Sequence, residues 1–371
     1  MSAPRESSPS SRAPRDSTAA RRWVSRRTVA LVALVTASTL LIGCTAPAAE
    51  PVGDARPSPS PSPSPEYVSS FVEPAVPAIA PLTGELIEPG SLARSALAAK
   101  IDNHPRARPQ VGLDRADVVF EELVEGGLTR YIGVWHSDVP AEVGPIRSIR
   151  PMDPDIISPL GGIVAYSGGQ QRFVDMMRAT QVYNAIHGQS DTNAVMYRGS
   201  NAPAPHNVLV RAPELIGQHP GIAAPAQQFA FAADAASATA AKEGQPIGSM
   251  AMTFGSLATP SWAWDAASGS WLRSMTGGAP DTAASGARLS AVNVVVMRVP
   301  VDVIQDIPTT QMIGSGEAWV SSGGKIVPAT WSKPDQNTPP RLLDAQGAAV
   351  RLAPGATWVE LVPTAGSFSF Q

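Results

Sequence analysis

The chain has 371 residues, of which 28 are basic and 31 acidic, so its formal net charge is −3 at pH 7. An acidic protein is repelled by nucleic acid and by anionic lipid, which argues against binding to either through bulk electrostatic attraction. The single cysteine excludes an intrachain disulfide and a metal site built from several cysteines.

The first 43 residues have the layout of a secretory signal peptide. A basic segment is followed by an apolar run from Val29 to Ile42, which is shorter than the roughly 20 residues that a membrane-spanning helix needs. The run ends in Leu41-Ile42-Gly43-Cys44, the pattern of a bacterial lipobox. In a lipobox the cysteine thiol is alkylated with diacylglycerol and becomes the first residue of the mature protein. We therefore predict that residues 1–43 are removed and that Cys44 is lipidated.

Residues 44–81 are predicted to form a linker between the lipidated cysteine and the folded part. Proline and serine alternate from Pro57 to Pro65, and such a stretch favours extended polyproline II structure. At about 3.1 Å per residue, a linker of this length reaches on the order of 100 Å. Loss of residues 1–43 would leave 21 basic and 29 acidic side chains, a net charge near −8.

The folded part begins near Leu82, and residues 82–222 are predicted to form an N-terminal α/β-like layered domain with a mixed sheet. Strands are expected at 96–102, 117–125, 130–136 and 162–167, and helices at 151–160 and 170–179. Segment 117–125 fits a helix as well as a strand. The Gly126-Gly127 turn and the strand that follows favour a strand.

Residues 223–371 are predicted to form a mostly antiparallel, β-rich C-terminal domain, which makes the whole chain α+β. An alanine-rich connection leads into short apolar strands, and glycine ends the turns between them. The strands are expected at 249–255, 262–265, 270–275, 291–301, 317–320, 325–332 and 357–362. The tryptophans of this part would fill a thin β core.

Polar and glycine residues concentrate in the first predicted domain. Arg147 and Arg150 flank Ser148 just before a predicted helix, where guanidinium groups and free backbone N–H groups would favour an anion. The alternative is that these arginines form ordinary surface pairs with nearby acidic residues. The candidate ligand-binding residues are Asn103, Arg108, Gln110, Arg130, Arg147, Ser148, Arg150, His206 and Asn207.

Asp117, Glu121 and Glu125 are candidates for catalysis. Glu121 and Glu125 are four residues apart and would face the same side, where paired carboxylates act as acid and base or bind a cation. The alternative is a solvated hairpin face. The histidines lack the spacing of metal ligands, and Gly168-Gly169 comes without a P-loop lysine. We therefore predict no metal site and no cofactor.

Several motifs carry a resemblance to a known family. In the first domain they are Arg108-Pro109-Gln110, Glu125-Gly126-Gly127-Leu128-Thr129-Arg130, Gly144-Pro145-Ile146-Arg147-Ser148 and His206-Asn207. In the second they are Asn293-Val294-Val295-Val296, Ile313-Gly314-Ser315-Gly316 and Leu352-Ala353-Pro354-Gly355-Ala356-Thr357-Trp358. With these motifs the chain resembles the YerB-like lipoproteins, bacterial envelope proteins of unknown function. The resemblance implies an α/β-like domain, a β-rich domain and membrane anchoring, and it implies no activity.

These observations predict a lipoprotein anchored at the extracytoplasmic face of the cell membrane. It would bind an anionic cell-envelope ligand in a cleft lined by Arg108, Arg130, Arg147 and Arg150. One alternative is an envelope phosphotransferase or hydrolase in which an acidic residue holds a divalent ion. Another is a scaffold that binds envelope proteins through its tryptophan-bearing β domain. The scaffold gains support if the arginines and the Glu121–Glu125 pair are scattered, and no nucleic-acid partner is expected.

The lipobox leads to a direct test. Replacing Cys44 with alanine removes the thiol that would be alkylated, so the protein should leave washed membranes or retain its signal peptide. Fractionation and immunoblotting measure both outcomes, and Thr45→Ala serves as a control that should stay membrane-bound. A Cys44→Ala protein that remains in the membrane at its mature size would contradict the prediction.

Overall fold

The structure is a computed structural model that describes residues 68–71, 77–200 and 202–371. The described residues from 77 onwards belong to one compact unit. Cys44, the predicted signal peptide and most of the predicted linker lie outside the described residues. Within the described ranges, no helix is both long enough and apolar enough to cross a membrane.

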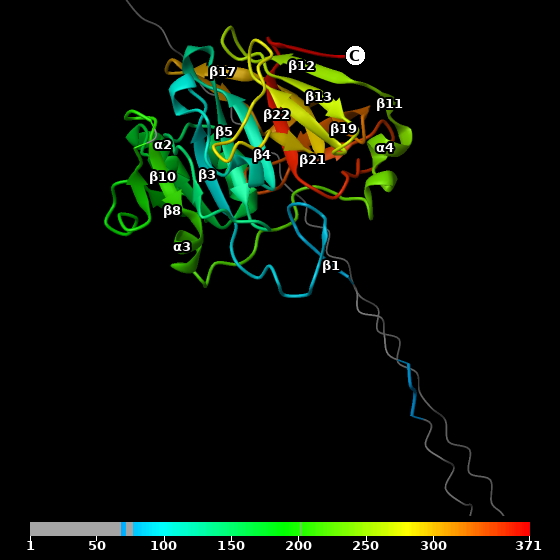
Figure 1. Cartoon of the computed structure of the whole chain (residues 1–371), viewed down its shortest axis with the longest axis horizontal. Coiled ribbons are helices and arrows are strands. Elements are labelled where there is room, and N and C mark those ends of the chain that lie inside the picture. The colour runs from blue at the N-terminus through cyan, green and yellow to red at the C-terminus, as the bar shows by residue number, and fades with distance from the viewer. Residues whose placement is uncertain (1–67, 72–76, 201) are drawn as a thin grey trace, which may run out of the picture. The chain divides into compact units, whose positions relative to one another are not determined.

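A mixed 11-stranded sheet runs through the compact unit (Figure 1). Its order is β11-β20-β19-β16-β22-β4-β5-β3-β7-β8, and β21 pairs with β20. The strands from the first predicted domain are β3 (Leu97–Asp102), β4 (Val118–Leu123), β5 (Thr129–Trp135), β7 (Ile163–Tyr166) and β8 (Tyr183–Ile186). Those from the second are β11 (Gln245–Pro246), β16 (Asn293–Val299), β19 (Gly314–Ser322), β20 (Lys325–Lys333), β21 (Arg341–Leu343) and β22 (Thr357–Pro363).

The parallel pairing of β22 with β4 joins the two predicted domains into this one sheet. Thr357 to Leu361 lie opposite Val118 to Glu122. β3 and β4 are both antiparallel to β5. Four further strands run in the same direction as β3 and β4, namely β7, β8, β16 and β22. The carboxyl ends of these strands therefore meet at one edge of the sheet, where α/β proteins commonly bind ligands.

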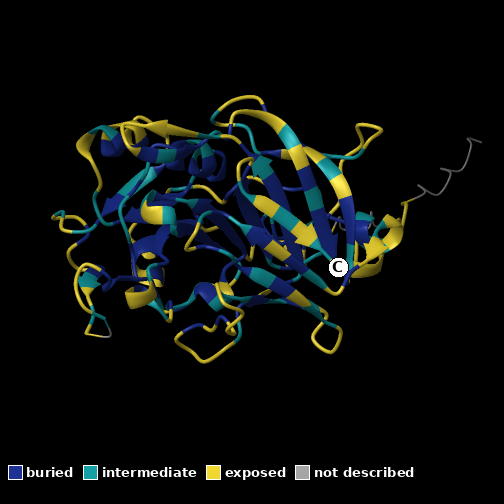
Figure 2. Ribbon diagram, turned by 90° about the horizontal axis from the view of Figure 1, so that it is seen from above, coloured by how far each residue is buried: buried dark blue, intermediate teal, exposed yellow. Residues whose placement is uncertain are grey.

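Each face of the central sheet is covered by a different layer. On the helix face, Phe120 and Ile132 pack with residues of α1 (Asp153–Ile157), η4 (Ser158–Leu160) and α2 (Gln171–Arg178). On the opposite face, which we call the sandwich face, Val119 and Tyr131 pack with residues of the smaller sheets. Figure 2 shows the buried strand residues between exposed loops.

The smaller sheets and helices complete the unit. The five-stranded antiparallel sheet comprises β15 (Ser290–Ala291), β14 (Ser270–Ser274), β13 (Ser261–Asp265), β12 (Ser249–Thr253) and β23 (Ser367–Phe370). The others are β6 (Glu142–Val143) with β10 (Val208–Arg211) and β9 (Met196–Arg198), β1 (Ala78–Ile79) with β2 (Leu86–Ile87), and β17 (Val301–Ile304) with β18 (Ile307–Thr310). The remaining helices are η1 (Pro105–Ala107), η2 (Leu113–Arg115), η3 (Glu125–Gly127), α3 (Ala212–Gly217), η5 (Ala235–Ser237) and α4 (Thr239–Glu243).

The predicted fold class is confirmed. The first part contributes a mixed set of strands with helices, and the second part is mainly antiparallel. The ambiguous segment forms strand β4, as favoured by the turn that follows it. The boundary between residues 222 and 223 stays a prediction, and the sharing of one sheet by both parts was not foreseen.

A fully buried ion cluster attaches α1 to the helix face. Lys100 of β3 contacts the carboxylates of Glu122 on β4 and of Asp153 at the start of α1, and the Asp153 contact measures 2.6 Å. All three side chains have no exposed surface. Burial lowers the pKa of Lys100 to about 8 even though Asp153 opposes the shift. The cluster therefore depends on each charge keeping its partners.

This dependence predicts a large loss of stability for Lys100→Met. The substitution leaves two carboxylates buried without a cation, and breaking a buried pair typically costs about 3–5 kcal/mol. Urea unfolding of the two proteins measures the difference. Lys242→Met replaces an exposed lysine and should change the free energy of unfolding by less than about 0.5 kcal/mol. A Lys100→Met protein as stable as the wild type would show that the cluster does not hold the helix.

Candidate functional site

A pocket of about 450 Å³ lies on the sandwich face at the carboxyl edge of the central sheet. The first predicted domain contributes the loop after β3 and the beginning of β5. The second contributes the turn between β12 and β13 and the end of β14. The apolar residues of its wall are Pro105, Pro109, Leu128, Leu257, Ala258, Pro260 and Met275.

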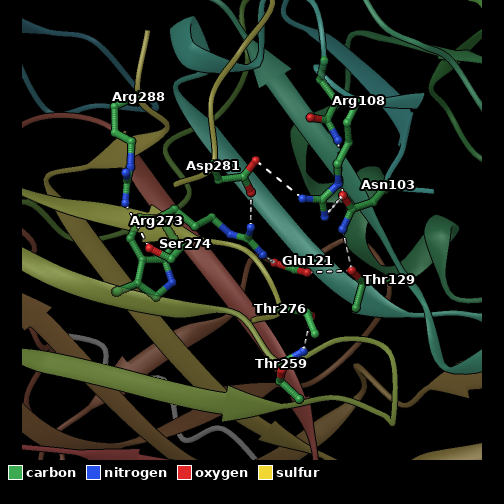
Figure 3. Close-up of polar contacts among 12 residues, drawn as sticks. Asn103, Arg108, Glu121, Thr129, Thr259, Arg273, Ser274, Thr276, Asp281 and Arg288 are labelled. Atoms are coloured by element: carbon green, nitrogen blue, oxygen red, sulfur yellow. Dashed lines mark hydrogen bonds and ion pairs between the residues drawn. The ribbon is translucent and has the colours of Figure 1, made fainter. Parts of the chain in front are cut away.

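A continuous polar network forms one side of this pocket (Figure 3). Arg273 donates to Glu121 and to Asp281, and its side chain is 1% exposed. Thr129 Oγ1 donates to Glu121 Oε1 at 2.6 Å, and Asn103 Nδ2 donates to Thr129 Oγ1 at 2.7 Å. The network thus ties β4 and β5 to β14.

Beneath Arg273, Glu360 of β22 lies next to Glu121 in the register of the parallel pair. Trp262 Nε1 donates to Glu360 Oε1 at 2.7 Å, and Glu360 has no exposed surface. Burial and the adjacent charge of Glu121 raise the pKa of Glu360 well above its ordinary value. Burial and the neighbouring carboxylate thus favour the protonated form of Glu360, while Arg273 pairs with Glu121 and Asp281.

Arg108 is the more exposed of the two arginines that line the pocket, with 21% of its side chain exposed against 1% for Arg273. Its Nη2 donates to Asn103 Oδ1 at 2.6 Å, while its Nη1 lies 3.6 Å from Asp281 Oδ1, beyond a good hydrogen bond. Its Nε has no hydrogen-bond partner among the described residues. Gln110, which is fully buried, donates to the same Asn103 oxygen at 3.2 Å.

The other predicted arginines gather on the helix face, because successive strand residues point to opposite faces. Asp102 lies opposite Arg130 and belongs to the same alternating row as Lys100, whereas Asn103 and Thr129 contact the pocket. Asp102 Oδ2 lies 3.1 Å from Arg147 Nε and 2.7 Å from His206 Nδ1. We call Arg130, Arg147 and Arg150 the arginine group.

The predicted ligand-binding residues therefore divide into two sets. Asn103, Arg108 and Gln110 belong to the pocket network, while Ser148 and His206 accompany the arginine group. Asn207 joins neither set, since it bonds to Gly199 and Arg198. The four arginines do not line one cleft, and the reason is the alternation of side chains along β3 and β5.

The three candidate acids are also separated. Asp117 accepts hydrogen bonds from the backbone N–H groups of His136 and Ser137 at 2.6 and 2.8 Å, which holds the end of β5. Glu121 pairs with Arg273, whereas Glu125 lies beyond the end of β4 and pairs with Arg150 at 2.8 Å. Among the described residues, no group of three or more acidic, histidine or cysteine side chains is placed to hold a metal.

Sequence reasoning missed the residues that the second part contributes, above all Arg273, Asp281 and Glu360. One signal was present in the sequence. In the strand Ser270–Ser274, the alternation that buries Trp271 also buries Arg273. A charged residue on the core-facing side of a strand needs a buried partner, which points to a polar network.

Both parts of the chain match models of one protein family. Residues 82–222 match the model "Protein of unknown function (DUF3048) N-terminal domain", and residues 250–359 match that of the DUF3048 C-terminal domain. The chain belongs to this family. The pocket is lined by residues from both matched segments, so its walls require both parts.

Two comparisons with one relative agree with this assignment. The chain is 32% identical over 128 residues to "Putative lipoprotein YerB" of Bacillus subtilis (strain 168), an alignment that spans 34% of this chain and 38% of the relative. A crystal structure of YerB protein from Bacillus subtilis superposes with a TM-score of 0.67 at 21% identity. The superposition covers 79% of this chain and 99% of the other, and it shows a shared fold.

The two adjacent glutamates should respond differently to the same substitution. Glu121→Gln removes a charge that Arg273 needs and should cost about 3–5 kcal/mol. Glu360→Gln substitutes a neutral amide for a carboxyl group whose raised pKa favours the neutral form, so it should change stability far less. Urea unfolding measures both variants, and equal losses would contradict the different environments of the two glutamates.

The direction of the Glu360 pKa shift predicts how the free energy of unfolding changes with pH. Because the pKa of Glu360 in the folded protein lies above its ordinary value of 4.5, the folded state keeps a proton that the unfolded chain releases as pH rises. Glu360 therefore stabilises the folded state below pH 4.5. This contribution is lost as pH rises towards the pKa of Glu360 in the folded protein. The stability of Glu360→Gln relative to the wild type should therefore increase as pH rises above the ordinary value of 4.5.

Proposed function

We propose that the protein is a lipid-anchored extracytoplasmic protein that binds an anionic, amphipathic cell-envelope ligand in the pocket. Arg108 would hold the acidic group, and the aliphatic walls would hold hydrocarbon. Anchoring at Cys44 is supported by the lipobox and by the name of the Bacillus relative. A polyprenyl phosphate has the required chemistry.

The observation that carries the proposal is the incomplete pairing of Arg108. Its side chain is 21% exposed and its Nη1 reaches Asp281 only at 3.6 Å, while its Nε, also without a partner among the described residues, is buried. Hydrogen bonds from a guanidinium to a phosphate or carboxylate oxygen are short and strong. An incoming acid would therefore gain contacts without breaking a good ion pair.

The size and lining of the pocket fit the remainder of such a ligand. A volume of about 450 Å³ lies in the range of small-molecule sites. Pro105, Pro109 and Met275 offer apolar surface beside Arg108. Leu257, on the wall contributed by the second part, is 58% exposed and would be covered by a bound chain.

The separation of the four arginines and of Glu121 from Glu125 supports the scaffold alternative, by the criterion given above, whereas the burial of four tryptophans disfavours it in the form considered there. Trp262, Trp271, Trp331 and Trp358 are each no more than 2% exposed. They fill the core and present little surface to another protein. The tryptophan-bearing sheet thus supports the pocket from within.

Binding of geranyl phosphate and of geraniol to the full chain in detergent tests the proposal. Arg108→Gln should weaken geranyl phosphate binding by roughly 10- to 100-fold, because it removes charged hydrogen bonds. Geraniol lacks the acidic group and should bind more weakly than geranyl phosphate. Arg108→Gln should leave the affinity for geraniol unchanged. Isothermal titration calorimetry measures both ligands.

Arg115→Gln is the matched control, because Arg115 forms an exposed pair with Asp138 away from the pocket. It should bind geranyl phosphate as the wild type does. The proposal fails if the wild type binds no geranyl phosphate, or if Arg108→Gln binds it equally well.

A further inference from the structure

The helix face carries a second concentration of positive charge that the pocket does not use. The guanidinium groups of Arg130 and Arg150 both approach the carbonyl oxygen of Ser148, at 2.8 and 3.4 Å. Arg150 Nη1 also lies 3.1 Å from the Ser148 hydroxyl. Arg147 lies close enough to Arg130 for its charge to lower the pKa of Arg130, so the three guanidinium groups form one group.

Two carboxylates partly balance these three charges. Glu125 pairs with Arg150, and Asp102 lies beside Arg147. Arg147 Nε is buried and lacks an aligned hydrogen bond to Asp102 despite the 3.1 Å separation. Asp102 Oδ2 is also shared with His206, whose ring stacks on His104 with 4.4 Å between centroids.

Arg130 is the member of the group without an ion pair, although it donates a hydrogen bond to the Ser148 carbonyl oxygen and the charges of Asp102 and Glu125 act on it. It is only 8% exposed, yet it takes part in none of the ion pairs among the described residues. Burial lowers its pKa to about 10, with Arg150 adding to the shift, so it remains charged at neutral pH. A buried cation without a paired anion is costly unless a ligand supplies the anion.

We propose that Arg130, Arg147 and Arg150 form a second binding site, for a phosphate or pyrophosphate group, on the helix face of the sheet. Forked guanidinium groups fit the oxygens of such an anion, and the Ser148 hydroxyl adds a neutral polar group. The site is independent of the pocket, because Arg108 and Asn103 lie on the sandwich face. The anion is either free or the headgroup of a lipid.

Titration of the full chain in detergent with inorganic pyrophosphate tests this site. Pyrophosphate should raise the melting temperature of the wild type, and Arg130→Met should weaken its binding roughly tenfold or more. Arg130→Met breaks no ion pair among the described residues but removes the hydrogen bond to the Ser148 carbonyl oxygen, so its melting temperature without ligand should change little. A loss of pyrophosphate binding at nearly unchanged stability is not expected of a structural arginine.

Three further variants sharpen the result. Arg115→Met should leave pyrophosphate binding unchanged, and so should Arg108→Gln, which separates this site from the pocket. Arg130→Lys keeps the positive charge but lacks the forked guanidinium group. The variant should fold, and it should bind pyrophosphate more weakly than the wild type. Dihexanoyl phosphatidic acid is the second ligand, and tighter binding than pyrophosphate would identify a lipid headgroup as the anion.

The proposal is overturned if the wild type binds neither compound, or if Arg130→Met and Arg130→Lys both bind as the wild type does. It is also overturned if Arg108→Gln abolishes pyrophosphate binding, since one site would then account for all the arginines. Failure of geranyl phosphate to bind would leave this result unaffected, because pyrophosphate has no apolar part.

Discussion

The parallel pairing of β22 with β4 is the contact on which the rest of the structure depends. It joins residues more than two hundred positions apart in the chain and places Thr357 to Leu361 beside Val118 to Glu122. Because of this register, Glu360 lies next to Glu121 in a buried site. The two carboxyl groups are compatible because the raised pKa of Glu360 favours its neutral form and Glu121 is paired with Arg273.

The same pairing joins the two segments that match the family models into one sheet, and each face of that sheet carries a candidate site. The sandwich face holds the pocket, whose polar network runs from Arg108 to Arg273. The helix face holds the Lys100 cluster deep in the core and the arginine group at the edge. Neighbouring residues of one strand, such as Thr129 and Arg130, thus serve different sites.

Much of the fold could be predicted from local pattern. The apolar residues of 118–120 and the glycine turn after them indicated β4, and the spacing of Phe173, Val174 and Met177 indicated α2, where all three are buried. Hydrophobic periodicity tells which residues share a face, but it does not tell which strand is the neighbour. Hydrophobic periodicity therefore could not predict the β22–β4 pairing or the shared sheet.

The candidate site was predicted only in part for the same reason. The polar and glycine residues of the first part drew attention to Asn103, Arg108 and Gln110, which lie together. They also drew attention to Arg130, Arg147 and Arg150, which lie together elsewhere. Which group faces which layer depends on the sheet's neighbours. Arg273 and Asp281 come from a distant segment, and only the burial of Arg273 within an alternating strand hinted at them.

Hydrogen exchange measured by mass spectrometry on the full chain tests the central claim, that the two segments form one cooperative sheet through β22 and β4. Amides of 118–123 and of 357–363 should exchange through the same opening event and with the same free energy. Selective rapid exchange of 357–363, with 118–123 still protected, would contradict the claim.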